Sequence, residues 1–138
     1  MNDVPDMAWN GSSDTETLLA AIVEWGLERA LEKSFGMFAF ALWDRQENLL
    51  SLARDRMGEK PLYFGWQGKG ESKAFLFASE LKSLRAHPKF LGEIYSDAIN
   101  LQLRHNYIPA PYSIYKDIQK LLPGHFLELK EYDLKKGM

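Results

Sequence analysis

The fold is decided by the stretch Ala53-Arg54-Asp55-Arg56-Met57-Gly58-Glu59-Lys60-Pro61-Leu62-Tyr63-Phe64-Gly65. It joins two apolar runs, and its charged middle contains Gly58 and Pro61. Glycine reaches backbone conformations that are closed to other residues, and proline fixes the φ angle where the next strand begins. We therefore predict a structural corner between two strands, in which Arg54 pairs with Asp55 and the Lys60 side chain lies in solvent.

The segments around this corner read as two antiparallel hairpins. Residues 37–43 and 49–53 flank the turn 44–48, and residues 62–66 and 74–78 flank a tip rich in glycine. Residues 37–43 are apolar at consecutive positions, as expected for a strand that is covered on both faces. We therefore expect an α+β fold in which one antiparallel sheet packs against a second, with helices outside.

Helical periodicity follows the segment Ser13-Asp14-Thr15-Glu16, which has the Ser-x-x-Glu form of a capping box. In a capping box, the serine and glutamate side chains each accept from the other residue's backbone amide. Gly26 interrupts the apolar stripe, and glycine inside a helix costs about 1 kcal/mol relative to alanine. The sequence therefore predicts one helix at about 14–25 and a shorter one at about 27–34.

The second half of the chain is predicted to contain two more helices, at 80–86 and from Ser96 until the segment Pro109-Ala110-Pro111 ends it. Two short strands are expected, at 114–115 and 126–129. The charged residues 130–138 resemble the beginning of a linker.

Composition narrows the possible functions. The net charge of −2 provides no basic surface for nucleic acid or anionic membranes. The chain has no cysteine, which excludes disulfides, thiolate metal sites and cysteine catalysis by these residues. The three histidines have no partner at metal-ligand spacing, so no metal site is predicted. The start has no positively charged and apolar signal segment, and we expect a cytoplasmic protein.

Three blocks carry a family resemblance: residues 36–44 (GMFAFALWD), residues 53–65 and residues 77–84 (FASELKSL). In this order and spacing they resemble the glutaminase domain of glutamine-dependent asparagine synthetases, a class-II glutamine amidotransferase. The resemblance covers about residues 9–130. It implies the N-terminal-nucleophile fold, a four-layer helix–sheet–sheet–helix sandwich whose nucleophile is an N-terminal cysteine.

The resemblance also implies a site. The family's aspartate in the Ser-Asp-Thr-Glu segment accepts from the α-amino group of bound glutamine, and that role is carried onto Asp14. The alternative is that Asp14 only completes the helix cap, where negative charge is favourable. Arg54, Asp55 and Gly58 are expected to be structural residues near the site. Asn10-Gly11 stands too close to Asp14 to be the Asn-Gly pair that supplies the family's oxyanion donors.

We therefore expect residues 1–130 to be the C-terminal portion of a glutaminase domain and residues 131–138 to begin a linker. The linker would lead to a missing synthetase domain that binds ATP and Mg²⁺, whereas this chain holds no cofactor. The parent reaction would be glutamine hydrolysis followed by ATP-dependent amidation of aspartate. Without the cysteine, the chain alone is expected to be inactive.

Two alternatives stay open at this point. The chain could derive from another class-II amidotransferase, of purine or amino-sugar synthesis. It could also be a non-catalytic interaction module that binds a partner, or a second copy as a homo-oligomer, through sheet edges left without a neighbouring strand.

Overall fold

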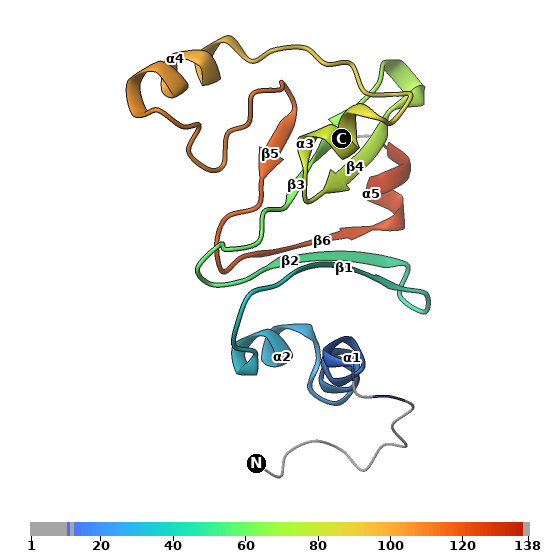
Figure 1. Cartoon of the computed structure of the whole chain (residues 1–138). Coiled ribbons are helices and arrows are strands. Elements are labelled where there is room, and N and C mark those ends of the chain that lie inside the picture. The colour runs from blue at the N-terminus through green and yellow to red at the C-terminus, as the bar shows by residue number, and fades with distance from the viewer. Residues whose placement is uncertain (1–10, 12, 137–138) are drawn as a thin grey trace. The chain divides into compact units, whose positions relative to one another are not determined.

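The computed structural model describes residue 11 and residues 13–136 of the chain. The chain divides into two compact units, residues 1–36 and residues 37–138. Each unit is described by itself below, with elements labelled as in Figure 1.

The first unit contains helices α1 (Asp14–Trp25) and α2 (Leu27–Lys33). Gly26 separates them with a φ of 79°, a value that favours glycine. Its N–H donates to the carbonyl of Ile22 at 2.9 Å, and its carbonyl accepts from the N–H of Ala30 at 3.1 Å. One glycine therefore ends α1 and begins α2, which confirms the predicted break.

The start of α1 confirms part of the predicted capping box. Ser13 Oγ accepts from the N–H of Thr15 at 3.2 Å, so the serine caps the helix as expected. The Glu16 carboxylate accepts from the N–H of Gly11 at 3.0 Å. The reciprocal bond from the Ser13 N–H to Glu16 therefore stays a prediction.

The first sheet of the second unit has the order β1-β2-β6 and is antiparallel throughout (Figure 1). Its strands are β1 (Ala39–Asp44), β2 (Leu49–Arg54) and β6 (Phe126–Lys130). The β1–β2 turn is held by Asp44 Oδ1, which accepts from the backbone amides of residues 46 and 47. The predicted first hairpin and the strand at 126–129 are confirmed.

The second sheet has the order β4-β3-β5, again antiparallel. Its strands are β3 (Tyr63–Gln67), β4 (Ala74–Ala78) and β5 (Ile118–Lys120), and the 3₁₀ turn η1 (Gly70–Ser72) lies between β3 and β4. The strand expected at 114–115 was wrong, since Tyr115 forms only an isolated bridge with Ile94. β5 has just three residues, two of them polar, so it is pairing with β3 that makes it a strand.

The short helix α3 (Leu81–Arg85) lies where a helix was expected at 80–86, and α4 (Ser96–His105) begins at the predicted residue. The end of α4 was assigned wrongly to the prolines. Asn106 ends the helix with a left-handed φ of 62°, and its N–H donates to the carbonyl of Gln102 at 2.8 Å. Asparagine is a common residue at this position, so a local signal was present in the sequence.

Residues 131–136, which were expected to begin a linker, form the helix α5 (Glu131–Lys136). Leu134 packs against the core next to β6, and Glu131 pairs with Lys135 at 2.7 Å. The Glu131 N–H also donates to the carbonyl of Asn48 at 2.9 Å, so packing and polar bonds together hold this charged segment.

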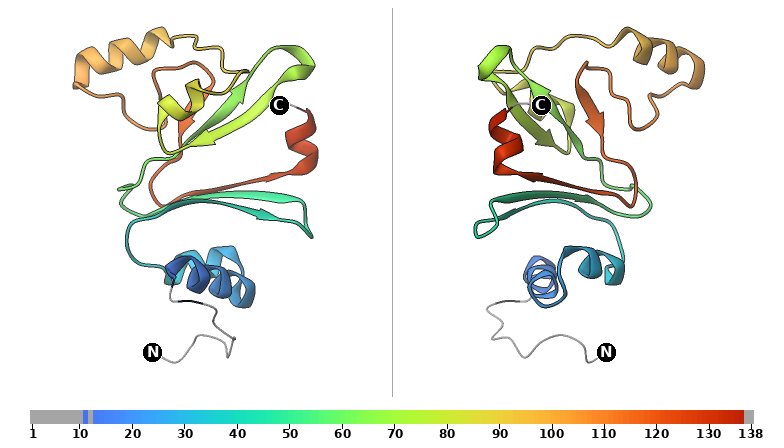
Figure 2. Two further views of the ribbon diagram at one scale, coloured as in Figure 1. Left: turned by 45° about the vertical axis from the view of Figure 1, so that its right-hand side comes forward. Right: turned by 180° about the vertical axis from the view of Figure 1, so that it is seen from behind.

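The two sheets of the second unit pack face to face. Side chains from β2 and β6 meet side chains from β3 and β4 in one core cluster, centred on Leu52, which is fully buried. The opposite face of the β4-β3-β5 sheet is covered by α3, through a second cluster around Leu84 (Figure 2). Sheet-on-sheet packing with a helix outside is therefore confirmed within this unit.

β1 corrects one expectation about burial. We expected a strand covered on both faces, but Trp43 is 42 % exposed and Ala41 is exposed. Among the described residues, β1 pairs with β2 alone and so forms an edge of its sheet. The α+β class with antiparallel sheets is confirmed, whereas the four-layer sandwich remains a prediction.

Candidate functional site

Asp14 is the first residue of α1, as the sequence predicts. Its side chain is exposed, and its Oδ1 accepts from the N–H of Thr15 at 2.9 Å. No other bond to this carboxylate is formed by the described residues, so most of its acceptor capacity is open to a ligand. The ligand role of Asp14 stays a prediction, and Asn10 lies outside the described residues.

Arg54 holds the corner after β2 with its whole guanidinium. Nε donates to the carbonyl of Lys60 at 2.7 Å, Nη1 to that of Leu121 at 2.6 Å and Nη2 to that of Gly58 at 2.6 Å. The expected pair between Arg54 and Asp55 was wrong. A planar fork of donors fits several carbonyls at once, so the arginine bonds to the backbone and not to Asp55.

Asp55 is 1 % exposed and faces the backbone of the same turn. Oδ1 accepts from the amides of Met57 at 3.1 Å and Glu59 at 2.9 Å, and Oδ2 accepts from that of Lys60 at 3.0 Å. Burial by itself raises the pKa of this carboxyl, but the hydrogen bonds from the surrounding amides outweigh it and hold the pKa below its usual value. Asp55 is therefore a buried structural anion.

Gly58 adopts a backbone conformation that disfavours other residues, as the sequence predicts for this corner. Its φ is +69°, and a Cβ atom placed on it would lie 2.7 Å from Cγ of Pro123 and 3.1 Å from Nη2 of Arg54. Both the backbone angle and the space thus require glycine. Arg54, Asp55 and Gly58 come together as one structural unit, while Lys60 is exposed as predicted.

Sequence reasoning missed the segment that closes the corner from the far end of the chain. The carbonyl of Asp55 accepts from the N–H of Gly124 at 2.9 Å, and the N–H of Arg54 donates to the carbonyl of His125 at 3.1 Å. The Pro123-Gly124 turn was visible in the sequence. Its partner was not, since nearly seventy positions separate the two segments.

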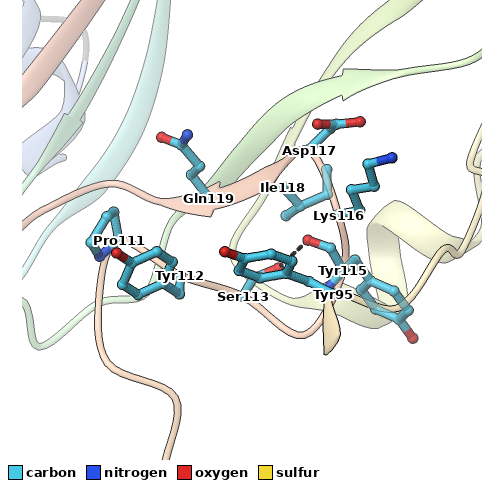
Figure 3. Close-up of a pocket in the computed structure, with 9 residues that line it drawn as sticks. All are labelled: Tyr95, Pro111, Tyr112, Ser113, Tyr115, Lys116, Asp117, Ile118 and Gln119. Carbon is cyan, nitrogen blue, oxygen red and sulfur yellow. Dashed lines mark hydrogen bonds between the residues drawn. The ribbon is translucent and has the colours of Figure 1, made fainter. Parts of the chain in front are cut away.

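A pocket of about 310 Å³ lies beside β5 and the residues that precede it (Figure 3). The rings of Tyr95 and Tyr112 form part of its wall, with centroids 6.3 Å apart. A hydrogen bond and the negative charge of Asp97 raise the pKa of the Tyr95 hydroxyl. Ser113 is buried, and its Oγ bonds to the backbone of Tyr115. No sequence motif pointed to this pocket, because its walls come from a loop and a three-residue strand.

The described residues contain neither a cluster of possible metal ligands nor a helix that could cross a membrane. No three His, Asp or Glu side chains there gather closely enough to hold a metal ion. His87 and His125 lie in loops, where Nδ1 of each contacts backbone two residues away. None of the helices within residues 13–136 combines the length and apolar composition that crossing a membrane requires.

Comparison with known proteins gives this architecture a family. A family model described as "Glutamine amidotransferase domain" matches residues 3–137, nearly the whole chain. The chain belongs to this family. The match extends past both ends of the region 9–130 in which the resemblance was recognised, and it includes α5.

Curated relatives of this amidotransferase chain include larger enzymes. The chain is 37 % identical over 118 residues to asparagine synthetase [glutamine-hydrolyzing] 3 of Bacillus subtilis. The aligned region covers 84 % of the chain and 18 % of that relative. Asparagine synthetase [glutamine-hydrolyzing] 1 of the same organism is 35 % identical over 84 % of the chain and 17 % of its own length. "Amidase chyE" of Penicillium rubens is 34 % identical over 85 % of the chain and 16 % of its own length. The chain thus spans less than a fifth of each of these relatives.

Proposed function

We propose that this chain is part of a glutaminase domain of the asparagine synthetase type. The parent protein hydrolyses glutamine to glutamate and ammonia, then uses ATP to convert aspartate to asparagine with that ammonia. The observation that carries this proposal is the family match over residues 3–137, together with relatives named as glutamine-hydrolysing asparagine synthetases. Because the chain spans less than a fifth of those relatives, the portion that binds ATP and Mg²⁺ is assigned to sequence beyond these residues.

We also assign the complete domain to the four-layer sandwich. The core between the two sheets of residues 37–138, with α3 on the outer face of one of them, supports this assignment. The remaining layer would be helical.

Hydrolysis of glutamine by this class needs a thiol nucleophile, an amine base and donors for the oxyanion. The 138 residues contain no cysteine. In the intact enzyme these groups are therefore supplied by residues outside this sequence. The chain alone does not release ammonia from glutamine, because nothing in it can form the acyl-enzyme thioester.

Asp14 binds the α-ammonium group of glutamine in the intact domain. Its carboxylate is exposed and already fixed by the bond from Thr15 at 2.9 Å. A charge-assisted hydrogen bond to a fixed carboxylate is about twice as strong as a neutral one. The corner of Arg54, Asp55 and Gly58 has a structural role in the same domain.

The first experiment measures ammonia release from glutamine by the 138-residue chain. We expect none above a heat-treated control. Turnover that persists through repurification would contradict the proposed dependence on an external cysteine.

The second experiment uses a longer chain that restores the upstream residues and an N-terminal cysteine. We expect glutamine hydrolysis to return, and Asp14→Asn to weaken the apparent affinity for glutamine by about 1–3 kcal/mol. In a full-length enzyme that also contains the synthetase domain, synthesis from free ammonia should be unchanged by Asp14→Asn, since ammonia needs no α-ammonium contact. Glu28→Gln, which removes an exposed carboxylate from the first turn of α2, is the matched control and should leave both reactions unchanged. Equal glutamine kinetics for Asp14→Asn and Glu28→Gln would return Asp14 to the role of a helix cap.

A non-catalytic interaction module is the second candidate, favoured by the edge strand β1 with its exposed Trp43. Such an edge can pair with a strand of a partner or of a second copy. DNA sequence upstream of the first codon distinguishes the two candidates. Codons for Met-Cys-Gly-Ile and for an Asn-Gly-Glu segment favour the glutaminase, and their absence favours the module.

A further inference from the structure

A groove of about 420 Å³ opens between the two sheets of the second unit. One wall is aromatic, with Trp66 and Phe64 from β3 and Phe75 from β4; the rings of Trp66 and Phe75 meet edge to face at 5.2 Å. The opposite wall is Leu127 and Leu129 of β6. The interior of the groove is therefore suited to an apolar stem.

Asp117 lies at this groove, at the residue just before β5. Asp117 also lines the pocket beside β5. In Figure 3 the side chain of Asp117 points away from the tyrosine rings of that pocket. The charge of Asp117 is therefore available to the groove between the sheets.

The Asp117 carboxylate has no hydrogen bond or ion pair with the described residues. Its neighbour Lys116 pairs instead with Glu93, at 3.6 Å. The exposed Lys73 also lines the groove, but it forms no ion pair with Asp117. The groove therefore offers an unpaired carboxylate together with a tryptophan, the aromatic residue that attracts cations best.

The backbone that presents Asp117 is rigidly held. Its φ of 59° is left-handed, and its carbonyl lies so close to Gly65 that a Cβ there would be 1.8 Å from the oxygen. The buried amide of Gln67 also donates to the carbonyl of Lys116 at 3.1 Å and accepts from the N–H of Leu91 at 3.0 Å. A carboxylate on a fixed backbone loses little freedom when it binds a ligand, which favours affinity.

We propose that this groove binds a small organic cation, an ammonium group on an apolar stem. The ammonium lies between the Asp117 carboxylate and the Trp66 ring, and the stem lies between the aromatic wall and the leucines of β6. The inference goes beyond the glutaminase reaction and does not depend on it.

The test is a titration followed by two-dimensional NMR, with the Trp66 indole N–H assigned through Trp66→Phe. The probes are n-hexylammonium and the neutral n-hexanol, which share the stem and differ in charge. We expect saturable shifts at Trp66 with n-hexylammonium and binding of n-hexanol that is about tenfold weaker or less. N-acetyl-lysine methylamide tests a polypeptide source of the ammonium, and we expect weaker binding because its backbone does not fit between the sheets.

Asp117→Asn is the decisive variant, because asparagine tolerates the left-handed backbone and keeps the side-chain volume. We expect it to weaken n-hexylammonium binding about tenfold, as for a lost charge-assisted hydrogen bond, and to leave n-hexanol unchanged. Glu47→Gln in the β1–β2 turn removes the same charge from an exposed site and should leave both probes unchanged. Equal binding of the two probes, an unchanged affinity in Asp117→Asn, or shifts that avoid Trp66 would each overturn the proposal.

Discussion

The start of α1 and the corner after β2 both contain an aspartate that the family resemblance singles out, yet the two carboxylates have opposite surroundings. Asp14 is exposed and accepts one described bond, from Thr15. Asp55 is 1 % exposed and accepts from three backbone amides. A carboxylate whose acceptor sites are filled by its own chain fixes structure, whereas one with open sites is available to a ligand. The burial and bonding of Asp55 fit the structural role expected from the sequence, while the ligand role of Asp14 stays a prediction.

The largest loss of stability is expected when a methyl group is added at the corner after β2. Gly58→Ala should lower the free energy of unfolding by about 2–4 kcal/mol, because a methyl group meets Pro123 at 2.7 Å and the φ of +69° is strained for alanine. Gly70→Ala is the matched control: its φ is +55°, but nothing lies within 4 Å, so we expect about 1 kcal/mol. Urea unfolding of both variants measures the difference. Equal losses would mean that the corner is no tighter than the hairpin tip.

Asp55→Asn should cost about 2–3 kcal/mol of unfolding free energy. Asparagine keeps one oxygen for Met57 and Glu59 but turns an amide donor toward the N–H of Lys60, which loses its acceptor. Asp44→Asn is the control. The backbone amides of Gln46 and Glu47 both donate to Oδ1 of Asp44, an oxygen that asparagine retains. A loss of unfolding free energy in Asp44→Asn as large as that in Asp55→Asn would mean that the corner depends on its carboxylate no more than the β1–β2 turn does.

The same variant has a predicted pH dependence. The pKa of Asp55 is lowered in the folded state from its usual 3.8, so the ionised carboxylate stabilises the fold fully above that pH. This contribution is lost as pH falls through the lower folded-state pKa. The melting temperatures of the wild type and Asp55→Asn should therefore differ at pH 7 and converge below about pH 4. A difference that stays constant down to pH 2 would contradict an ionised Asp55.

The smallest effect on stability is expected at α1. Asp14→Asn retains the oxygen that accepts from Thr15 and loses only the interaction with the helix dipole, about 0.5 kcal/mol. Ser13→Ala removes the cap of the same turn and should cost about 1 kcal/mol. Hydrogen exchange of the α1 amides compares the two variants. A larger loss of protection in Asp14→Asn than in Ser13→Ala would mean that Asp14 serves the helix first.

Local signals in the sequence determined much of this protein. The capping serine, Gly26 and the apolar periodicity located α1 and α2, and the charged turns between apolar runs located both hairpins. The need for glycine at residue 58 and the amidotransferase family could also be predicted, because they depend on residues that are close together in the chain.

Only the tertiary structure decided which distant groups meet. β5 exists because β3 supplies its hydrogen bonds, and α5 is held by the packing of Leu134 and by the bond from Glu131 to Asn48. Arg54 reaches the carbonyl of Leu121 rather than the carboxylate beside it, and Gly124 closes the same corner. Such contacts depend on which segments the folded chain brings together. Periodicity and spacing along the sequence report backbone conformation and burial, but they carry no information about the partner.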